Sequence, residues 1–450
     1  MHYSFGQFLS LIGSLGLFLF GMKLMSESLQ KVAGDRMRNI LAAMTSNRFK
    51  SILTGMLITM VIQSSSATTV MVVSFVNAGL ISLVQSIGVI MGANIGTTAT
   101  AWLISLLGFK FSISVIALPL VGVGFPFIFS KNVNRKSWGE LIVGFAILFL
   151  GLDYLKDSVP NISENPQLLE FFQNYTSQGF FSVLLFIGIG TILTMIIQSS
   201  SATMALTLVM CNNGWMSYEL AAAMVLGENI GTTITAVLAS TVANVYAKRA
   251  ARAHMIFNVF GVLWMLFVFP YFIRAIGYSI VYFGGVSPFE SPQSTPVALS
   301  LFHTSFNVMN VLVQVMFTPA IVKVVTFMVP HRKEEDEEFR LRHLEIGLLS
   351  TVELSLLQAY KEINIYATRT YRMYGFFKEL FTETNEKKFK ELFDRIEKYE
   401  EISDRVEVEI ATYLTKVSTS ELSEESSKRM QSMLKIISDI ESMSDSNYTL

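Results

Sequence analysis

Charged residues are scarce in this chain of 450 residues. Asp, Glu, Lys and Arg make up 15% of it, hydrophobic residues make up 51%, and the mean hydropathy is +0.48. A soluble protein would carry charge at about a quarter of its positions, so an ordinary soluble globular class is excluded. The charges are also uneven: 1–330 is a series of long apolar segments, whereas 331–450 is dense in charge. We therefore expect a transmembrane domain over 1–330 and a soluble helical domain over 331–450.

Cysteine and nucleotide-binding motifs are also rare or missing. Cys211 is the single cysteine, which excludes an intramolecular disulfide and a cysteine-rich metal site. The serine-rich segments have no nearby His–Asp relay, and the sequence has no Gly-x-x-x-x-Gly-Lys loop. We expect neither an enzyme nor a nucleotide-driven pump, and we expect no required cofactor and no nucleic-acid partner.

Nine apolar stretches are long enough to cross a membrane at roughly 20 residues each, and no cleavable signal peptide is evident before the first. They lie at about 5–29, 51–80, 84–107, 111–130, 139–155, 180–210, 218–243, 253–284 and 297–328. Basic residues mark the cytoplasmic side and cluster at 31–50, 131–136, 248–252 and 332–333. The connections 157–178 and 285–296 contain no Lys or Arg. We therefore expect a multi-pass membrane protein, surrounded by lipid, with its N-terminus outside and its C-terminal domain cytoplasmic.

Two polar motifs each occur twice inside these apolar surroundings. Gln-Ser-Ser-Ser-Ala-Thr occupies 63–68 and 198–203, and Gly-x-Asn-Ile-Gly-Thr-Thr occupies 92–98 and 227–233. The second copy follows the first at the same spacing for both motifs, so the chain contains an internal repeat without a gap. Hydroxyl and amide groups are costly in hydrocarbon unless they are bonded. Two such motifs, placed symmetrically, predict the two halves of one site.

The loop charges indicate that the repeats are inverted. The similar segments 16–28 and 145–158 must cross in opposite directions, which predicts a pseudo-twofold axis in the membrane plane, as in many secondary transporters. Repeat 1 is expected at about 5–130 and repeat 2 at about 139–284, followed by an extra span at about 297–328. Each polar interruption favours a re-entrant or broken helix. The predicted fold is an all-α polytopic membrane protein with inverted repeats, followed by a soluble helical bundle.

The motif chemistry suits an anion and cations together. Serine and threonine hydroxyls both donate and accept, a broken helix offers N-terminal amides to an anion, and freed carbonyls suit a hard cation. The glycines of the second motif are expected to add flexibility. Neither 52–105 nor 183–240 contains Lys or Arg, so a divalent anion bound there needs positive charge from co-bound cations or from helix dipoles.

The paired Gln-Ser-Ser-Ser motifs in inverted repeats resemble those of the type II sodium-dependent phosphate cotransporters and their bacterial relatives, over about 10–328. This resemblance implies inorganic phosphate as the substrate and Na+ as the coupling ion. It places these ligands among Gln63, Ser64, Ser65, Ser66, Gln198, Ser199, Ser200 and Ser201. The further candidates are Thr68, Asn94, Thr97, Thr98, Thr203, Asn229, Thr232 and Thr233.

The two copies differ at one informative position. Ala93 in the first repeat corresponds to Glu228 in the second. Acidic residues inside membrane segments are functional by default, and this one could bind sodium or carry a proton; the alternative is a carboxylate that faces water at the mouth of the segment. A second similarity is that His254 and Asn258 have the same spacing as His303 and Asn307. Each pair would lie on one helix face, where it could form interhelical hydrogen bonds or act as a proton relay.

The C-terminal domain contains two Glu-x-x-x-Asp spacings, Glu400 with Asp404 and Glu441 with Asp445. Residues at i and i+4 project from one helix face, where their carboxylates could hold a hard metal ion, although solvated surface also explains such pairs. The domain resembles the PhoU-like helical bundles of many bacterial members, in which this motif binds metal clusters. The bundle is expected to be truncated.

Together these features predict a sodium-coupled phosphate symporter that imports its substrate by alternating access. A carrier of another oxyanion, proton coupling, and a phosphate sensor without net transport stay open as alternatives. The sequence leaves the oligomeric state and the stoichiometry open.

Overall fold

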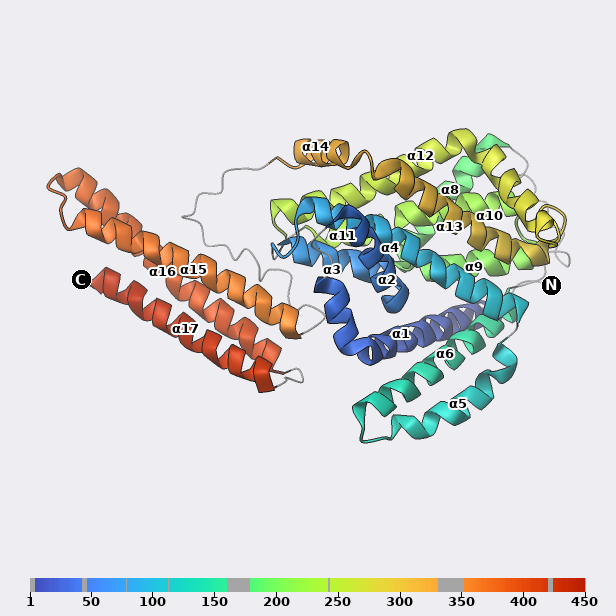
Figure 1. Ribbon diagram of the computed structural model, residues 1–450, viewed down its shortest axis with the longest axis horizontal. Helices are drawn as coiled ribbons and strands as arrows, with labels where there is room; N and C mark the ends of the chain where they lie inside the picture. Colours follow the sequence, from blue (N-terminus) through green and yellow to red (C-terminus); the bar gives the residue numbers. More distant parts are fainter. Residues whose placement is uncertain are drawn as a thin grey trace. The chain divides into compact units, whose positions relative to one another are not determined.

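The computed structural model describes residues 5–42, 47–77, 79–111, 113–159, 179–241, 243–330, 352–419 and 424–449. Its regular elements in these ranges are all helices (Figure 1), which confirms the expected all-α class. The contacts divide the chain into two compact units, which we describe separately. The first comprises Met1–Val72, Leu83–Leu238 and Ala250–Val325, and the second comprises Val73–Ser82, Ala239–Arg249 and Thr326–Leu450.

The described part of the apolar region contains a series of helices. They are α1 (Phe5–Ala42), α2 (Arg48–Ile62), α3 (Ser65–Asn77), α4 (Leu83–Leu103), the π-helix η2 (Ile104–Lys110), α5 (Ser114–Ile128), α6 (Val133–Ser158), α8 (Phe180–Ile197), α9 (Ser200–Asn212), α10 (Tyr218–Gly231), α11 (Thr233–Ala239), α12 (Val245–Tyr282), the 3-10 helix η4 (Pro292–Ser294), α13 (Thr295–Gln314) and α14 (Thr318–Met328). Among the described residues, seven helical segments are long and apolar enough to cross a membrane.

Helices α1 and α6 pack against each other in opposite directions. A Cβ atom on Gly21 would lie 2.3 Å from the backbone nitrogen of Leu148, and one on Gly151 would lie 2.3 Å from that of Phe18. Gly151 corresponds to Gly21, and Leu148 corresponds to Phe18, at one constant spacing along the chain. A twofold rotation that superposes α1 on α6 therefore turns the Gly21–Leu148 contact into the Gly151–Phe18 contact. Such an axis is perpendicular to two antiparallel helices. For helices that cross a membrane, this geometry is that of inverted repeats.

The first polar motif lies at the tip of a re-entrant hairpin. Helices α2 and α4 run parallel, because Gly88 faces Ser51 and Gly96 faces Met56. Helix α3 starts at the end of α2 and ends a few residues before the start of α4, so it must run back toward the side from which α2 came. Helices α8, α9 and α10 repeat this arrangement. The apolar stretches at 51–80 and 180–210 are therefore broken hairpins, as their polar interiors predicted.

The expected extra span at 297–328 is two helices instead of one. Helix α13 ends at Gln314 and α14 begins at Thr318, with hydrogen-bonded turns between them. Pro319 lies next to this junction; it has no N–H to donate to a preceding carbonyl, so it is accepted at the first turn of a new helix but not inside a continuous one. Only α13 is long enough to be a spanning segment.

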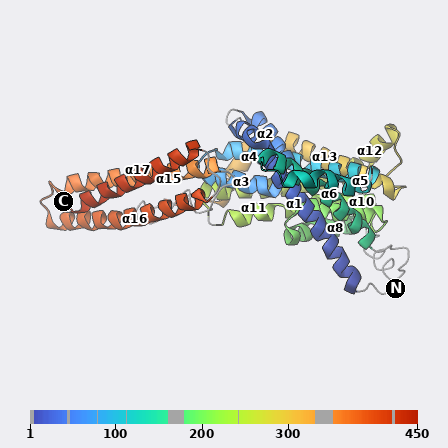
Figure 2. The same ribbon diagram turned by 90° about the horizontal axis from the view of Figure 1, so that it is seen from below.

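The second unit contains three long helices, α15 (Val352–Leu380), α16 (Glu386–Ser418) and α17 (Glu424–Thr449), which lie side by side in both views (Figures 1 and 2). Buried residues recur every three or four positions along α16, including Ile396, Tyr399, Val406 and Ile410, as expected for a helix with one face in a core. The first part of the soluble helical domain expected over 331–450, up to 351, falls outside the described residues.

Candidate functional site

Both hexapeptides begin where a helix ends in a left-handed turn. Gln63 follows α2 and Gln198 follows α8, and each has a φ of 55°. They are the two residues other than glycine with positive φ in the described ranges. A side chain in this conformation costs about 1–2 kcal/mol. The fold therefore holds the same strained residue at both breaks, where the chain must reverse.

The serine that follows each glutamine starts the next helix. The hydroxyl oxygen of Ser64 accepts a hydrogen bond from the N–H of Ala67, and that of Ser199 accepts one from the N–H of Ala202, both at 3.2 Å. The first amides of α3 and α9 have no partner within their own helix and lie at the positive end of its dipole. Each hexapeptide thus places backbone amides that can donate to an anion next to the last carbonyl oxygens of the preceding helix, which can coordinate a cation.

Pairs of threonines close the two hairpins. The Thr59 hydroxyl donates to Thr68 Oγ1 at 3.0 Å, and the Thr194 hydroxyl donates to Thr203 Oγ1 at 3.2 Å. All four side chains are buried, where an unbonded hydroxyl would be costly. Thr68 and Thr203, which the sequence nominated as site residues, therefore join the two arms of each hairpin.

The glycines of the second motif pack closely and do not act as flexible joints, which corrects the expectation from sequence. A Cβ atom on Gly92 would lie 1.8 Å from the carbonyl oxygen of Ile52, and one on Gly227 would lie 2.1 Å from that of Ile187. Because real Cβ atoms do not approach this closely, only glycine lets α4 and α10 pack against α2 and α8.

The polar side chains of the second motif bond mainly to their own helix. Four of them donate to a backbone carbonyl three or four residues earlier, each at 2.8 Å: Asn94, Thr98, Asn229 and Thr233. These bonds use the nitrogen of each Asn and leave its carboxamide oxygen available to a cation. Thr232 donates to the carbonyl of Glu228 at 2.7 Å, whereas the buried Thr97 hydroxyl has no hydrogen-bond partner among the described residues.

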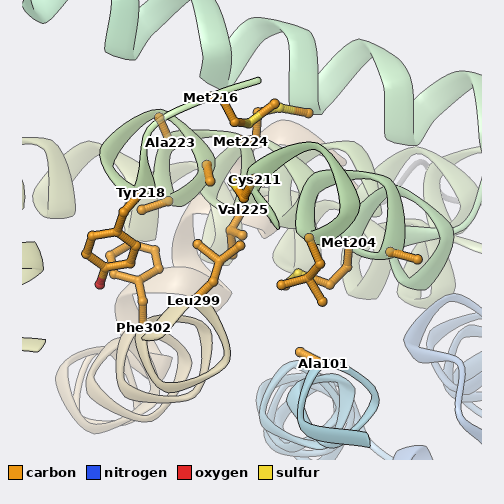
Figure 3. Packing of buried hydrophobic residues seen from close by; sticks show 14 of the residues in the cluster. Ala101, Met204, Cys211, Met216, Tyr218, Ala223, Met224, Val225, Leu299 and Phe302 are labelled. Carbon is orange, nitrogen blue, oxygen red and sulfur yellow. The ribbon is translucent and has the colours of Figure 1, made fainter. Parts of the chain in front are cut away.

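Helices from the two repeats meet in one core. Helix α4 of the first repeat contacts α9 of the second, and α13 contacts α4, α9 and α10. Met204 on α9 and Ala101 on α4 belong to the same buried cluster, shown in Figure 3. Within the hexapeptides, Ser65 and Ser201 are buried, while Ser66 and Ser200 are half-buried. The two motif-bearing halves are thus linked through α4, α9 and α13.

The two glutamines have different surroundings. The hydroxyl of Thr100, on α4, donates to Gln63 Oε1 at 3.0 Å and ties the first break to that helix. The equivalent Thr235 instead donates to the carbonyl of Thr232 at 2.9 Å, and the side chain of Gln198 is exposed. The first hairpin tip is therefore fixed to α4 by its glutamine, and the second tip lacks the corresponding bond.

Glu228 is buried, with 1% of its surface exposed, which removes the alternative of a carboxylate facing water. Its Oε1 accepts from the Thr207 hydroxyl at 2.9 Å, and its Oε2 has no hydrogen-bond partner among the described residues. Thr207 was not among the candidate site residues predicted from sequence. The signal was available, because the repeat spacing aligns Thr207 with Val72 just as it aligns Glu228 with Ala93.

The His–Asn pairs bond locally. The Nδ2 atoms of Asn258 and Asn307 donate to the carbonyls of His254 and His303, both at 3.0 Å. These bonds stay within one helix, so they do not supply the expected interhelical link. Such links come from Gln314, whose Nε2 donates to the carbonyl of Phe257 at 2.8 Å.

The tail brings three of its four nominated acids together. The carboxylate oxygens of Glu400, Asp404 and Asp445 lie within 4.8 Å of one another. Partial burial, followed by the charges of Asp404 and Asp445, raises the pKa of Glu400, and partial burial and Asp445 raise that of Asp404. Glu441 is outside this group, although partial burial and then Asp445 raise its pKa too. Three converging carboxylates are suitable ligands for a hard divalent ion.

Comparison with known families gives one match over most of the chain. The model described as Na+/Pi-cotransporter matches 17–157 and 163–287. These ranges contain both hexapeptides, both copies of the second motif and the glycine contacts between α1 and α6 at Gly21 and Gly151.

Individual relatives extend the similarity. “Putative inorganic phosphate export protein YjbB” of Escherichia coli K12 is 26% identical over 440 residues, which cover 97% of this chain and 76% of the relative. “Uncharacterized protein YqeW” of Bacillus subtilis is 31% identical over 318 residues, covering 70% of this chain and 95% of the relative. The rat “Sodium-dependent phosphate transport protein 2A” is 37% identical over 101 residues, 22% of this chain and 16% of the relative. No solved structure matches the chain.

Proposed function

Because the chain belongs to the Na+/Pi-cotransporter family, we propose that it carries inorganic phosphate across a bacterial inner membrane, coupled to sodium and by alternating access. The observation that carries this proposal is the doubled helix break at Gln63 and Gln198, with its capped helix N-terminus. We further propose that 1–330 is the transport domain and that 331–450 is a cytoplasmic helical domain. No enzymatic activity is proposed.

Phosphate would lie between the N-termini of α3 and α9, among the serine hydroxyls and free amides of both hexapeptides. Helix N-termini bind phosphate groups through such amides and through the helix dipole. Two opposed N-termini supply less than the full charge of a divalent anion, since each end is equivalent to roughly half a positive charge. The helices α2, α3, α4, α8, α9 and α10 contain basic residues only at the start of α2.

Sodium would supply the missing positive charge. The last carbonyls of α2 and α8, the carboxamide oxygens of Asn94 and Asn229 and the motif hydroxyls are neutral oxygen ligands of the kind that a hard cation prefers. Bound sodium lowers the cost of the buried anion, and bound phosphate lowers the cost of the buried cations, so each favours the other. This mutual dependence is the physical basis of the proposed coupling.

The direction of transport has two candidates. A symporter driven by an inward sodium gradient imports phosphate, which is the direction we propose. Export is the second candidate, because a relative that aligns with 97% of this chain is named for phosphate export. Proteoliposomes with sodium gradients of either sign distinguish the two, since an importer and an exporter give opposite net phosphate fluxes at physiological gradients.

The test of function is labelled phosphate uptake into proteoliposomes that contain the full chain. Ser65→Ala and Ser200→Ala should each reduce sodium-dependent uptake strongly. Ser279→Ala is the matched control, because Ser279 is a half-buried serine on α12 whose hydroxyl donates only to its own helix, at Ile276, at 2.7 Å. Phosphate uptake that does not depend on the sodium gradient would contradict the proposed sodium coupling. Phosphate binding without accumulation inside the vesicles would favour a sensor.

A further inference from the structure

Lys156, in the last turn of α6, bonds to the ends of helices from both repeats. Its ammonium group donates to the carbonyl oxygen of Gly108 at 2.6 Å, and Gly108 lies in η2, which directly continues α4 of the first repeat. The backbone carbonyl of Lys156 accepts a hydrogen bond from Asn213 Nδ2 at 3.2 Å, and Asn213 directly follows α9 of the second repeat. These two bonds, which we call the Lys156 bridge, join the end of α4–η2 to the end of α9.

The ammonium group of Lys156 is held firmly against η2. The last carbonyls of a helix have no partner within it and lie at the negative end of its dipole, so a charged donor is favourable there. The ammonium nitrogen also lies 3.6 Å from Asp153 Oδ1 and 4.6 Å from the centre of the Phe109 ring. A Cβ atom on Gly108 would lie 2.3 Å from Leu152 Cδ2, so η2 and α6 are in direct contact at this point.

The first repeat has no equivalent of this bridge. The spacing that relates α1 to α6 aligns Ser26 with Lys156. The Ser26 hydroxyl donates to the carbonyl of Ile62, the last residue of α2. The spacing of the two motifs aligns Ala78 with Asn213, so the side-chain amide is also specific to the second repeat. The Lys156 bridge is therefore not a product of the duplication.

The bridged helices carry parts of the proposed phosphate site. Helix α4 contains the first copy of the second motif and is bonded through Thr100 to Gln63, and α9 begins inside the second hexapeptide, at Ser200. Helix α6 ends at the connection 157–178, which has no Lys or Arg and is expected outside. Because the bridge is made at this end of α6, we expect the bridged ends of α4–η2 and α9 to lie on the outer side as well.

We propose that the Lys156 bridge holds the phosphate site closed toward the outside. This inference rests on the proposed function, because a carrier with alternating access must open its site to each side in turn. The site is formed by both repeats, so opening it outward requires α4–η2 and α9 to separate at their outer ends. At least one of the two bonds of Lys156 has to break in that step. Lys156 is thus a positioning residue that sets the balance between the closed and the outward-open states.

The separation of the two ends can be measured without any transport. Spin labels would be attached at Phe111→Cys, directly after η2, and at Glu219→Cys, in the first turn of α10, which follows α9. Both positions are exposed, and Cys211→Ser removes the single native cysteine. In lipid, Lys156→Met should shift the distance distribution of this labelled parent toward longer distances, because it keeps the length of the stem and removes the donor.

Three further variants show whether the shift comes from the bridge. Lys156→Arg keeps a charged donor and should shift the distribution less than Lys156→Met. Asn213→Ala breaks the other bond and should shift it in the same direction, which also serves if Lys156→Met does not fold. Lys23→Met is the matched control and should leave the distribution unchanged, because Lys23 forms an exposed ion pair with Glu27 on its own helix, at 3.8 Å.

The consequence for transport is a combined change in KM and kcat. The apparent affinity for phosphate supplied outside is reduced by the fraction of protein that is not outward-open. Lys156→Met should raise the outward-open fraction and so lower KM several-fold, while kcat falls because closing the outer side becomes less favourable. A lysine that only supports folding would reduce the amount of active protein and leave KM unchanged.

Two results would overturn the proposal. The first is a distance distribution of Lys156→Met that matches the labelled parent, and the second is a loss of kcat at unchanged KM. The distance measurement does not depend on phosphate transport. A chain that shows the shift but carries no phosphate would therefore contradict the proposed function and still support the bridge between the two helix ends.

Discussion

The first and second repeats share one scaffold and differ in how their hairpin tips are held. Both have a left-handed glutamine, a serine cap and a threonine pair. In the first repeat Thr100 fixes Gln63 to α4, whereas in the second Gln198 is exposed. The duplicated contacts form the hairpins. If the tips bind the proposed ligands, we expect the contacts found in one repeat alone to make the two tips respond differently.

The largest effect is expected where duplication requires close packing. Gly92→Val should prevent α4 from packing on α2, since even a Cβ atom would meet the Ile52 carbonyl at 1.8 Å. Overpacking costs about 1–3 kcal/mol or more, and here the neighbour is backbone that cannot move aside. Gly227→Val should be equally damaging in the second repeat.

Gly188→Ala on α8 is the control for these variants, because nothing lies within 4 Å of a Cβ atom there. It should keep or raise the melting temperature in detergent, because alanine favours a helix over glycine by about 0.5–1 kcal/mol. A Gly92→Val protein as stable as wild type would mean that the α2–α4 contact is not as close as described.

The threonine pairs should give smaller and equal losses. Thr59→Val and Thr194→Val each remove one hydrogen bond, at a cost of about 0.5–1.5 kcal/mol, because the hydroxyls of Thr68 and Thr203 still donate to the carbonyls of Ser64 and Ser199. The melting temperatures of the two variants should fall by similar amounts, because the Thr59–Thr68 and Thr194–Thr203 bonds join equivalent atoms at 3.0 Å and 3.2 Å. Clearly unequal falls in melting temperature would show that the two hairpins are not held together equally.

The KM values for transport should differ between variants of the two repeats, although the melting temperatures of the threonine-pair variants should not. Thr100→Val releases Gln63 from α4 and should raise the KM for phosphate or sodium several-fold. Thr235→Val removes only a bond within its own segment and should change KM less. Equal effects on KM would show that the Thr100–Gln63 bond does not distinguish the two halves.

The smallest effect is expected in the tail, which lies outside both repeats and so should leave their comparison unchanged. The pKa values of Glu400, Asp404 and Glu441 are raised above their ordinary range. Folding is therefore favoured below the ordinary carboxyl pKa, and this stability is lost as the pH rises through the raised values. These groups are largely solvated, so the loss should be modest.

Mn2+ or Mg2+ should recover that loss if the cluster binds metal. Added at neutral pH, the ion should raise the melting temperature of the wild type more than that of Asp404→Asn, since a ligand that binds the folded state stabilises it. Glu425→Gln, in an exposed ion pair of the same bundle, serves as the control. Equal shifts in wild type and Asp404→Asn would indicate no specific site.

The sequence predicted the broken hairpins because the hexapeptides are too polar for a continuous apolar helix. It did not predict that Gln63 and Gln198 would adopt the left-handed turn, since glycine is the usual residue there. The expectation that Gly92 and Gly227 add flexibility was wrong. The sequence alone does not distinguish a glycine that permits flexibility from one that permits close packing of two helices. Thr207 becomes recognisable only when the repeat spacing aligns it with Val72, as it aligns Glu228 with Ala93, because a threonine in a membrane helix is common by itself.

The central claim is that the two hexapeptides form one site for one phosphate, and a double-mutant cycle tests it most directly. Sodium-dependent phosphate affinity would be measured by calorimetry for wild type, Ser65→Ala, Ser200→Ala and the double variant. If both serines contact the same anion, the two losses should be non-additive by about 0.5–3 kcal/mol, as for residues that share a partner. Losses that add to within about 0.5 kcal/mol, as for independent positions, would contradict a shared site.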